Sequence, residues 1–223
     1  MRLDRNSFCI MRLCHHHKDA SLEWAVCCFD ESFSELSALC DDASLVDYAI
    51  EHFGSEKRRC EWLAARVLIN RLVGYSAEVC YSADGKPFFR NDPRCLSISH
   101  TDGYVAVALH REYNVGVDVE VIGAKVSKLY HRFISLAEIN SLDKKNELLA
   151  MLLHWSAKES FYKIIGNKGG SFAENFTVSP FTVCTSGVFL ISYTDNGNLI
   201  KKLPVNYFVE SDYVFTLCVD NEL

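Results

Sequence analysis

The stretch EWLAARVLINRLVG (Glu61–Gly74) has a counterpart later in the chain, HWSAKESFYKIIG (His154–Gly166). In both, a tryptophan precedes helix-forming residues and a glycine stands where a helix can end. The longer segment Glu56–Val73 carries apolar residues at steps of three and four, which predicts one buried helical face formed by Trp62, Ala65, Ile69 and Leu72. The matched pair therefore predicts two similar helices, the second extending over Leu148–Ile165.

A second pair of similar segments follows the helices in the same order. TDGYVAVAL (Thr101–Leu109) resembles SDYVFTLCV (Ser211–Val219), and both have the apolar, β-branched character of strands. Two matches in the same order indicate a duplicated unit. We therefore predict an α+β fold with subdomains 1–112 and 113–223, related by a pseudo-twofold axis, each a helix packed on an antiparallel sheet. A ligand site is expected at their junction.

Shorter signals fill in the remaining elements. Leu22–Phe29 has the pattern of a strand, Ser44–Phe53 that of a short helix, and Asp84–Pro87 that of a turn. Asn114–Val121 is a further strand, and strands resume from Phe176 through turns such as Asp195–Gly197. These alternations favour antiparallel sheets over a parallel one.

The composition indicates which classes of protein the chain can belong to. The 223 residues are 49% hydrophobic and 23% charged, enough apolar material for a globular core. We expect no membrane span, because no apolar run approaches about twenty residues, and a cytoplasmic location, because the start lacks a signal-peptide pattern. The ten cysteines are then reduced thiols. A net charge of −6 argues against a nucleic-acid partner, so any anionic ligand needs a local basic cluster.

A run of possible metal ligands lies near the start of the chain, at Cys14, His15, His16 and His17. Thiolate and imidazole are the ligands that zinc prefers, but a structural zinc site needs a second ligand pair, and the chain has no CxxC. We favour the alternative, a solvated polar turn.

The motif GVDVE (Gly116–Glu120) carries two carboxylates that strand alternation directs to one face. Adjacent like charges repel, and a hard divalent cation such as Mg²⁺ would relieve that repulsion. A solvent-facing strand with unrelated acids is the alternative for this motif taken alone. Glu159, on the predicted second helix, supplies a third acid, with Lys158 beside it and Lys163 four residues on.

Basic residues gather in the first of the two helices, at Lys57, Arg58, Arg59 and Arg66. Acids that hold a metal on one side and guanidinium groups on the other suit a polyphosphate. Lys86, beside a turn, and His100, at the end of a strand, could present further polar groups to the same ligand, although a lone histidine is more often structural.

In its motifs the chain resembles a known family, the larger, pseudo-dimeric type of 4'-phosphopantetheinyl transferase. The family pattern is a G-[IV]-D-x-E strand followed by W-[ST]-x-K-E-[AS]-x-x-K, and the chain has GVDVE at 116–120 and WSAKESFYK at 155–163. Earlier family motifs occur in order as EKR (Glu56–Arg58), GKPFF (Gly85–Phe89) and SISHTDGYVAVA (Ser97–Ala108). Ala65 and Ser160 replace small residues that are common in the family.

The resemblance implies an enzyme of the holo-carrier-protein synthase type. It would transfer the 4'-phosphopantetheine group of coenzyme A to a serine of an apo acyl or peptidyl carrier protein and release 3',5'-ADP. Mg²⁺ would be held by Asp118, Glu120 and Glu159, and catalysis would involve Glu159, Lys163 and Lys158. Coenzyme A would be bound by Arg58, Arg66, Lys86, Ser99 and His100, with Arg59 or Arg71 as substitutes. A monomer is expected.

Several alternatives remain open from the sequence. A catalytically silent relative could bind coenzyme A or a carrier, although the retained acids and lysines argue against it. A metal-dependent phosphohydrolase could use the same acids. The proton acceptor is Glu159 or a metal-bound water, with Glu138 in RFISLAEI (Arg132–Ile139) as a secondary candidate near the carrier side. The loop region between Val121 and Leu148 is where we expect the carrier to dock.

Overall fold

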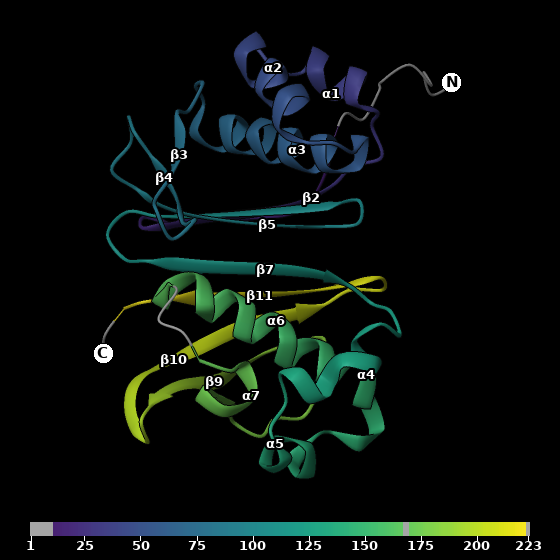
Figure 1. Ribbon diagram of the computed structural model, residues 1–223, viewed down its shortest axis with the longest axis vertical. Helices are drawn as coiled ribbons and strands as arrows, with labels where there is room; N and C mark the ends of the chain where they lie inside the picture. The colour runs from purple at the N-terminus through teal and green to yellow at the C-terminus, as the bar shows by residue number, and fades with distance from the viewer. Residues whose placement is uncertain (1–10, 167–169, 222–223) are drawn as a thin grey trace.

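The structure is a computed structural model that describes residues 11–166 and 170–221. Its strands form two larger antiparallel sheets and one two-stranded hairpin, and helices cover the outer face of each larger sheet (Figure 1). The predicted α+β class with antiparallel sheets is therefore confirmed. None of the helices in these two stretches is long and apolar enough to span a lipid bilayer.

The first sheet has the strand order β1-β2-β6-β5. Its strands are β1 (Arg12–Lys18), β2 (Leu22–Cys28), β5 (Cys95–Thr101) and β6 (Tyr104–His110). Between β2 and β5 the chain forms α1 (Phe33–Ala38), α2 (Ala43–His52), α3 (Glu56–Val73) and the hairpin of β3 (Val79–Tyr81) and β4 (Pro87–Phe89). The helix predicted over Glu56–Val73 has these bounds, and Gly74 ends it in the left-handed conformation, with φ 81°.

The second sheet has the order β7-β11-β10-β9-β8. Its strands are β7 (Val115–Val121), β8 (Phe176–Val178), β9 (Ser186–Asp195), β10 (Asn198–Val209) and β11 (Tyr213–Val219). Short helices follow β7, namely α4 (Val126–Leu129), η1 (Tyr130–Arg132), α5 (Leu136–Ser141) and η2 (Lys144–Asn146). Then come the long helix α6 (Glu147–Ile165) and α7 (Phe172–Asn175). The second predicted helix thus begins one residue earlier than expected.

The buried face of α3 differs from the predicted one. Leu63, Ala64 and Leu68 are fully buried against the first sheet, whereas Trp62 and Leu72 are only half-buried. Ala65 and Ile69 do lie in the core, so the predicted stripe was displaced by part of a turn. The displacement leaves Trp62 at the edge of the core, where its ring faces a cavity.

The histidine run forms a strand, so the expected polar turn was wrong. His15, His16 and His17 lie on β1, paired with Val26, Ala25 and Trp24 of β2. Each imidazole has a carboxylate within about 3 Å, and the pair that joins the two sheets is His15 Nε2 to Glu210 Oε1 at 2.9 Å. This strand was not predicted from the sequence, because its mostly polar residues do not alternate with apolar ones as they do in a half-buried strand.

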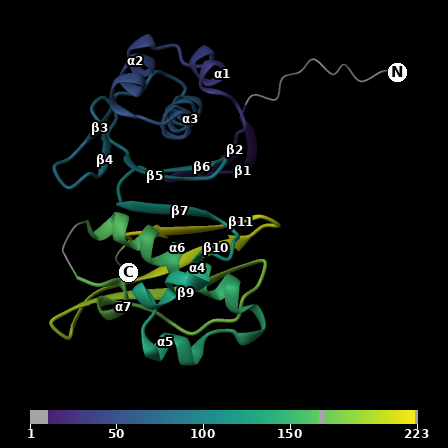
Figure 2. The same ribbon diagram turned by 45° about the vertical axis from the view of Figure 1, so that its right-hand side comes forward.

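The two larger sheets meet along β5 and β7, and Figure 2 shows them as adjacent layers with α3 and α6 on opposite outer sides. Among the strands of the described residues, β7 pairs with β11 alone and so forms an edge of its sheet. On its other side the hydroxyl of Ser97 accepts the Val117 N–H at 3.0 Å, and the hydroxyl of Ser99 accepts the Val119 N–H at 3.4 Å. Serine side chains thus stand in for a neighbouring strand.

Helix α6 packs closely on β7 at Gly116. A Cβ atom at this position would lie 1.8 Å from the carbonyl oxygen of Ser160, which is far inside contact distance. The absence of a side chain at Gly116 therefore sets the distance between α6 and the strand that carries Asp118 and Glu120.

Candidate functional site

A cavity of about 420 Å³ opens between α3, the β3–β4 hairpin, β5 and the C-terminal end of α6. It is lined from the first sheet and its helices and also from the second-half helix α6, through Tyr162, Lys163 and Gly166. Of the residues predicted to bind coenzyme A, the cavity is lined by Arg58, Arg66, Lys86 and His100. Residues from before β5 and from the end of α6, far apart in the sequence, thus line one cavity.

One face of α3 supplies the cationic and aromatic wall. Arg58, Trp62 and Arg66 are spaced four residues apart, so they project in a row toward the cavity. The Arg66 guanidinium carbon lies 4.1 Å from the centroid of the Trp62 ring, and its Nη2 donates to the hydroxyl of Tyr81 at 2.9 Å. Arg66 is 3% exposed and has no carboxylate partner among the described residues. A buried guanidinium without a counterion favours an anionic ligand.

Lys86 and His100 complete the basic side of the cavity. The Lys86 ammonium donates to the side-chain oxygen of Asn114 at 2.6 Å, so no carboxylate neutralises it there. His100 Nδ1 lies 3.5 Å from Glu61 Oε2, and that oxygen also accepts from Arg58 at 2.8 Å. Burial lowers the pKa of His100, which favours the neutral imidazole.

Asp118 lies at the centre of the acidic side. It is 4% exposed, and its Oδ1 accepts from the hydroxyl of Ser99 at 2.8 Å and from the ammonium of Lys163 at 3.0 Å. The other carboxylate oxygen, Oδ2, is buried and has no hydrogen-bond partner. An unpartnered buried carboxylate oxygen is costly unless a ligand or an ion completes its surroundings.

Glu120 and Glu159 share this environment. Burial, followed by the charge of Asp118, raises the pKa of Glu120 to about 7 and that of Glu159 to about 7. Glu120 Oε1 accepts the indole N–H of Trp155 at 2.7 Å, while Glu159 makes no hydrogen bond or ion pair with any described residue. The three predicted acids therefore repel one another in one partly buried region.

The donor chemistry of these acids fits a hard divalent cation. All three side chains offer carboxylate oxygens, and the unpartnered Oδ2 of Asp118 together with the unpaired Glu159 leaves oxygen ligands free. Over residues 11–166 and 170–221 no three His, Cys, Asp or Glu side chains already form a chelating group, the histidines of β1 included. The assignment of a divalent cation to these acids therefore rests on their carboxylate oxygens and on the repulsion between their charges.

A second cavity, of about 660 Å³, adjoins the first, because Arg58 and His100 line both. Glu120 and Trp155 form part of its wall, and the segment after β7 contributes Lys125 and Arg132. Glu120 therefore faces this second cavity, while Lys163, which is paired with Asp118, lines the first.

Four predicted residues lie elsewhere. Lys158, which the resemblance assigned to catalysis, is 0% exposed, and its ammonium is bound to Glu138 and to backbone carbonyls, so it does not reach either cavity. Ser99 lines neither cavity, because its hydroxyl is engaged between β5 and β7, which corrects its assignment to coenzyme A. Arg59 and Arg71 donate to the backbone carbonyls of Phe53 and Met11, outside the cavity lining.

The aromatic lining of the first cavity was not among the predicted site residues. The rings that line the first cavity are those of Tyr48, Phe53, Trp62, Tyr81 and Tyr162. The signal for Trp62 was its spacing of four residues from both Arg58 and Arg66, which places all three on one helical face. Tyr81 gave no signal, because the hairpin that carries it was not predicted.

The comparisons with known proteins agree with the resemblance noted from the motifs. Residues 114–218 match the model of the 4'-phosphopantetheinyl transferase superfamily, a stretch that contains all three acids. Over 120 residues the chain is 34% identical to the 4'-phosphopantetheinyl transferase AcpT of Salmonella typhi, and 32% identical to the protein of that name in Escherichia coli strain K12. The alignments cover 51% of this chain and 61% and 60% of those relatives, so less than two thirds of each relative is spanned.

The residues matched by the family model include the acids and the lysine described above. The matched stretch begins with β7, which carries Asp118 and Glu120, and includes α6, which carries Glu159 and Lys163. Residues 114–218 of this chain are therefore similar to the 4'-phosphopantetheinyl transferase superfamily, in the part of the chain that carries the three acids.

Proposed function

We propose that the chain is a phosphopantetheinyl transferase of the holo-carrier-protein synthase type. It would move the 4'-phosphopantetheine group of coenzyme A to a serine of an apo acyl or peptidyl carrier protein, with 3',5'-ADP as the second product. The proposal is carried by one observation: the cavity holds a buried arginine, Arg66, without a carboxylate partner, and it is linked through Lys163 to three mutually repelling acids. That arrangement suits a diphosphate bound together with a divalent cation.

The first cavity would bind the nucleotide part of coenzyme A. Arg66, buried without a carboxylate partner, and Lys86, whose ammonium donates to the amide oxygen of Asn114, would contact phosphate oxygens, because both offer charged donors. The rings of Trp62 and Tyr81 offer flat apolar surfaces for the adenine. Arg58 and His100, which line both cavities, would lie near the diphosphate.

Asp118, Glu120 and Glu159 would hold Mg²⁺. When bound, Mg²⁺ supplies positive charge to the diphosphate and so stabilises the leaving group. Lys163, whose ammonium already lies 3.0 Å from Asp118 Oδ1 and which lines the first cavity, would add a second positive charge beside the reacting phosphorus.

We further propose that Glu159 accepts the proton of the carrier serine. A carboxylate with a pKa of about 7 is matched to proton transfer near neutral pH, and Glu159 has no described partner that occupies it. In the reaction the serine oxygen forms a bond to the β-phosphorus while the bond from that phosphorus to the bridging oxygen breaks. The hydroxyl proton passes to Glu159, and 3',5'-ADP takes the electron pair.

The second cavity would receive the carrier protein. Lys125 and Arg132 lie on its rim, both exposed and without a carboxylate partner in the described part of the chain. Leu136, close by in sequence, is 81% exposed. Many carrier proteins are acidic, so basic side chains next to an apolar one suit such a partner despite the net charge of −6.

The larger, pseudo-dimeric subtype is also part of the proposal. The first sheet is built entirely from residues up to His110 and the second from Val115 onward, which supports subdomains 1–112 and 113–223 with a pseudo-twofold relation. Because both halves of one chain line the site, we propose that the protein acts as a monomer. All cysteines of the described part are free thiols, which supports a cytoplasmic location.

The test uses the full chain with Mg²⁺, coenzyme A and a panel of purified apo-carriers. Intact-protein mass spectrometry should find phosphopantetheine added to the conserved-motif serine of at least one carrier, as shown by peptide mapping. Release of free phosphopantetheine without any carrier would instead indicate a phosphohydrolase. Binding of coenzyme A with neither product would indicate a silent relative. Heat-denatured chain serves as the control for spontaneous addition.

A further inference from the structure

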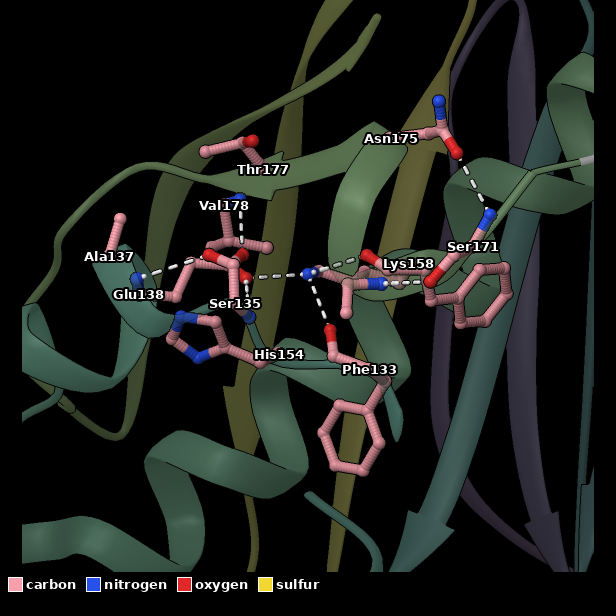
Figure 3. A network of polar contacts seen from close by, with 12 residues as sticks. Phe133, Ser135, Ala137, Glu138, His154, Lys158, Ser171, Asn175, Thr177 and Val178 are labelled. Carbon is pink, nitrogen blue, oxygen red and sulfur yellow. Dashed lines mark hydrogen bonds and ion pairs between the residues drawn. The ribbon is translucent and has the colours of Figure 1, made fainter. Parts of the chain in front are cut away.

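Lys158 lies at the centre of a buried polar network behind the site (Figure 3). Its side chain is 0% exposed, and its ammonium donates to Phe133 O at 2.6 Å, to Glu138 Oε2 at 2.8 Å and to Phe172 O at 3.0 Å. These three bonds use all three donors of the ammonium group. Lys158 therefore has no donor left for a ligand.

Glu138 extends the network to two more segments. Its Oε1 accepts the backbone N–H of Val178 at 2.8 Å, and its Oε2 accepts that of Ser135 at 2.8 Å, as part of the capping box of α5. The Glu138 side chain is 1% exposed. The ion pair thus ties α6 to the start of α5, to α7 and to β8, with every charged group satisfied.

The two carbonyls that Lys158 holds belong to phenylalanines whose rings flank one tryptophan. The ring centroids of Phe133 and Phe172 lie 5.1 Å and 5.8 Å from that of Trp155. Trp155 lies three residues before Lys158 on α6, and its indole N–H donates to Glu120 Oε1 at 2.7 Å. A continuous chain of contacts therefore connects the Lys158 ammonium to one of the three acids.

We propose that Lys158 is a positioning residue for the metal-binding acids. By fixing the backbone at Phe133 and Phe172 it holds the two rings against Trp155, and Trp155 in turn orients Glu120. The inference rests on the proposed function, in which Glu120 helps to hold Mg²⁺. It assigns the two lysines of the WSAKESFYK segment different tasks, since Lys163 lines the cavity and Lys158 lies behind it.

A buried ion pair is weak evidence for stability, because the cost of removing both charges from water offsets their attraction. Well-packed apolar replacements for such a pair are often neutral for stability, whereas removal of one partner alone leaves a buried charge. The double variant Lys158→Met/Glu138→Leu removes both charges together and retains apolar bulk. The pair Lys144→Met/Glu147→Leu, which removes an exposed ion pair of 2.7 Å at the start of α6, is the matched control.

The experiment uses two readouts on the full chain. The first is the indole N–H resonance of Trp155, assigned by its loss in Trp155→Phe, which reports the bond to Glu120 without any metal. The second is Mg²⁺ affinity by calorimetry. We expect the Lys158/Glu138 variant to shift the indole resonance toward that of an unbonded indole and to weaken Mg²⁺ binding about tenfold or more. The control should change neither.

A second variant tests the contact between the rings and Trp155 without changing the ion pair. Phe133→Leu removes one flanking ring but leaves every hydrogen bond of Lys158 in place, so it should produce the same resonance shift. An unchanged indole resonance and unchanged Mg²⁺ affinity in folded Lys158→Met/Glu138→Leu would overturn the inference. If the wild type binds no Mg²⁺ while the resonance still shifts, the positioning of Glu120 stands and the proposed function fails.

Discussion

Ser99 of β5 donates its hydroxyl hydrogen to Asp118 Oδ1 of β7 over 2.8 Å, across the boundary between the two sheets. The same hydroxyl accepts the Val119 N–H at 3.4 Å, and Lys163 binds the same carboxylate oxygen. The orientation of the central acid is thus set by residues of both halves, and only Oδ2 remains for a ligand.

Loss of the Ser99 hydroxyl should destabilise the protein. In Ser99→Ala, Oδ1 of Asp118 loses a donor and the Val119 N–H loses its acceptor inside a buried region, which should lower the free energy of unfolding by about 1–3 kcal/mol. Urea denaturation at constant pH measures the change. Ser127→Ala, which removes an exposed hydroxyl bound only to Ala124 O, should stay within about 0.5 kcal/mol of the wild type. Equal midpoints for both variants would refute the structural role.

The raised pKa of Glu159 predicts a pH-dependent stability. Because its pKa is about 7 in the folded state and near 4.5 in the unfolded state, the folded protein binds more protons between these values. The contribution of Glu159 to stability therefore falls as pH rises from about 4.5 through 7. Glu159→Gln lacks this titration. The free energy of unfolding of the variant, relative to that of the wild type, should therefore rise by about 2 kcal/mol when the pH is raised from 5 to 8.

Metal-free urea denaturation at both pH values tests this difference. Comparison of variant and wild type removes the contribution of other titrating groups, such as His100 and His154, whose pKa values are lowered by burial. A difference that does not change with pH would show that Glu159 is not perturbed.

Asp118→Asn should abolish metal-dependent transfer while the fold is retained. The amide keeps the shape of the side chain but removes the charge that draws a divalent cation, so transfer to an apo-carrier should fall by about a hundredfold or more. Circular dichroism checks the fold, and calorimetry should detect weaker Mg²⁺ binding. Asp195→Asn, on the remote β9–β10 turn, is the matched control. Full activity of Asp118→Asn would contradict the assignment of this acid.

Arg66→Ala should chiefly raise the KM for coenzyme A. Loss of a charge-assisted bond of about 1.5–3 kcal/mol corresponds to roughly a 10- to 100-fold higher KM, with kcat little changed. Arg90→Ala, which removes a 72% exposed arginine side chain, should leave KM unaltered. Dephospho-coenzyme A, tested on the wild type, should be used poorly. If it were used as well as coenzyme A, the cationic wall would not bind the 3'-phosphate.

Gly116→Ala should separate α6 from β7. The added Cβ would lie 1.8 Å from Ser160 O, a backbone atom that cannot move without the helix, so the expected loss of stability is about 3 kcal/mol. Gly123→Ala is the matched control, since nothing lies within 4 Å of its added Cβ. Thermal or urea unfolding compares the two, and similar stability for both would show that the close approach is not required.

The sequence predicted the parts of the fold that depend on periodicity. Helix α3 followed from apolar spacing, and α6 followed from its similarity to α3. Strand alternation placed Asp118 and Glu120 on one face, whereas the grouping of Glu159 with them followed from the family resemblance. β1 could not be predicted in this way, because a strand with polar side chains on both faces has no alternation.

Lys158 shows where reasoning from adjacency fails. It was grouped with Glu159 because the two are neighbours in sequence, but successive residues of a helix point about 100° apart. Lys158 therefore follows the buried residues His154 and Phe161 into the core, while Glu159 shares the outward side with Trp155 and Lys163. Helical periodicity alone could have separated the two roles. The cavity lining from Tyr81 could not be foreseen, because it depends on how the hairpin folds over α3.

The outer edge of β7 is closed by the hydroxyls of Ser97 and Ser99 instead of by another strand. A polypeptide containing only the portion from Val115 onward would leave those amide groups bare, and a bare strand edge recruits strands from other molecules. The segment that carries Ser97 and Ser99 therefore also protects this edge from pairing with other molecules. For this reason the protein is best produced as one continuous polypeptide.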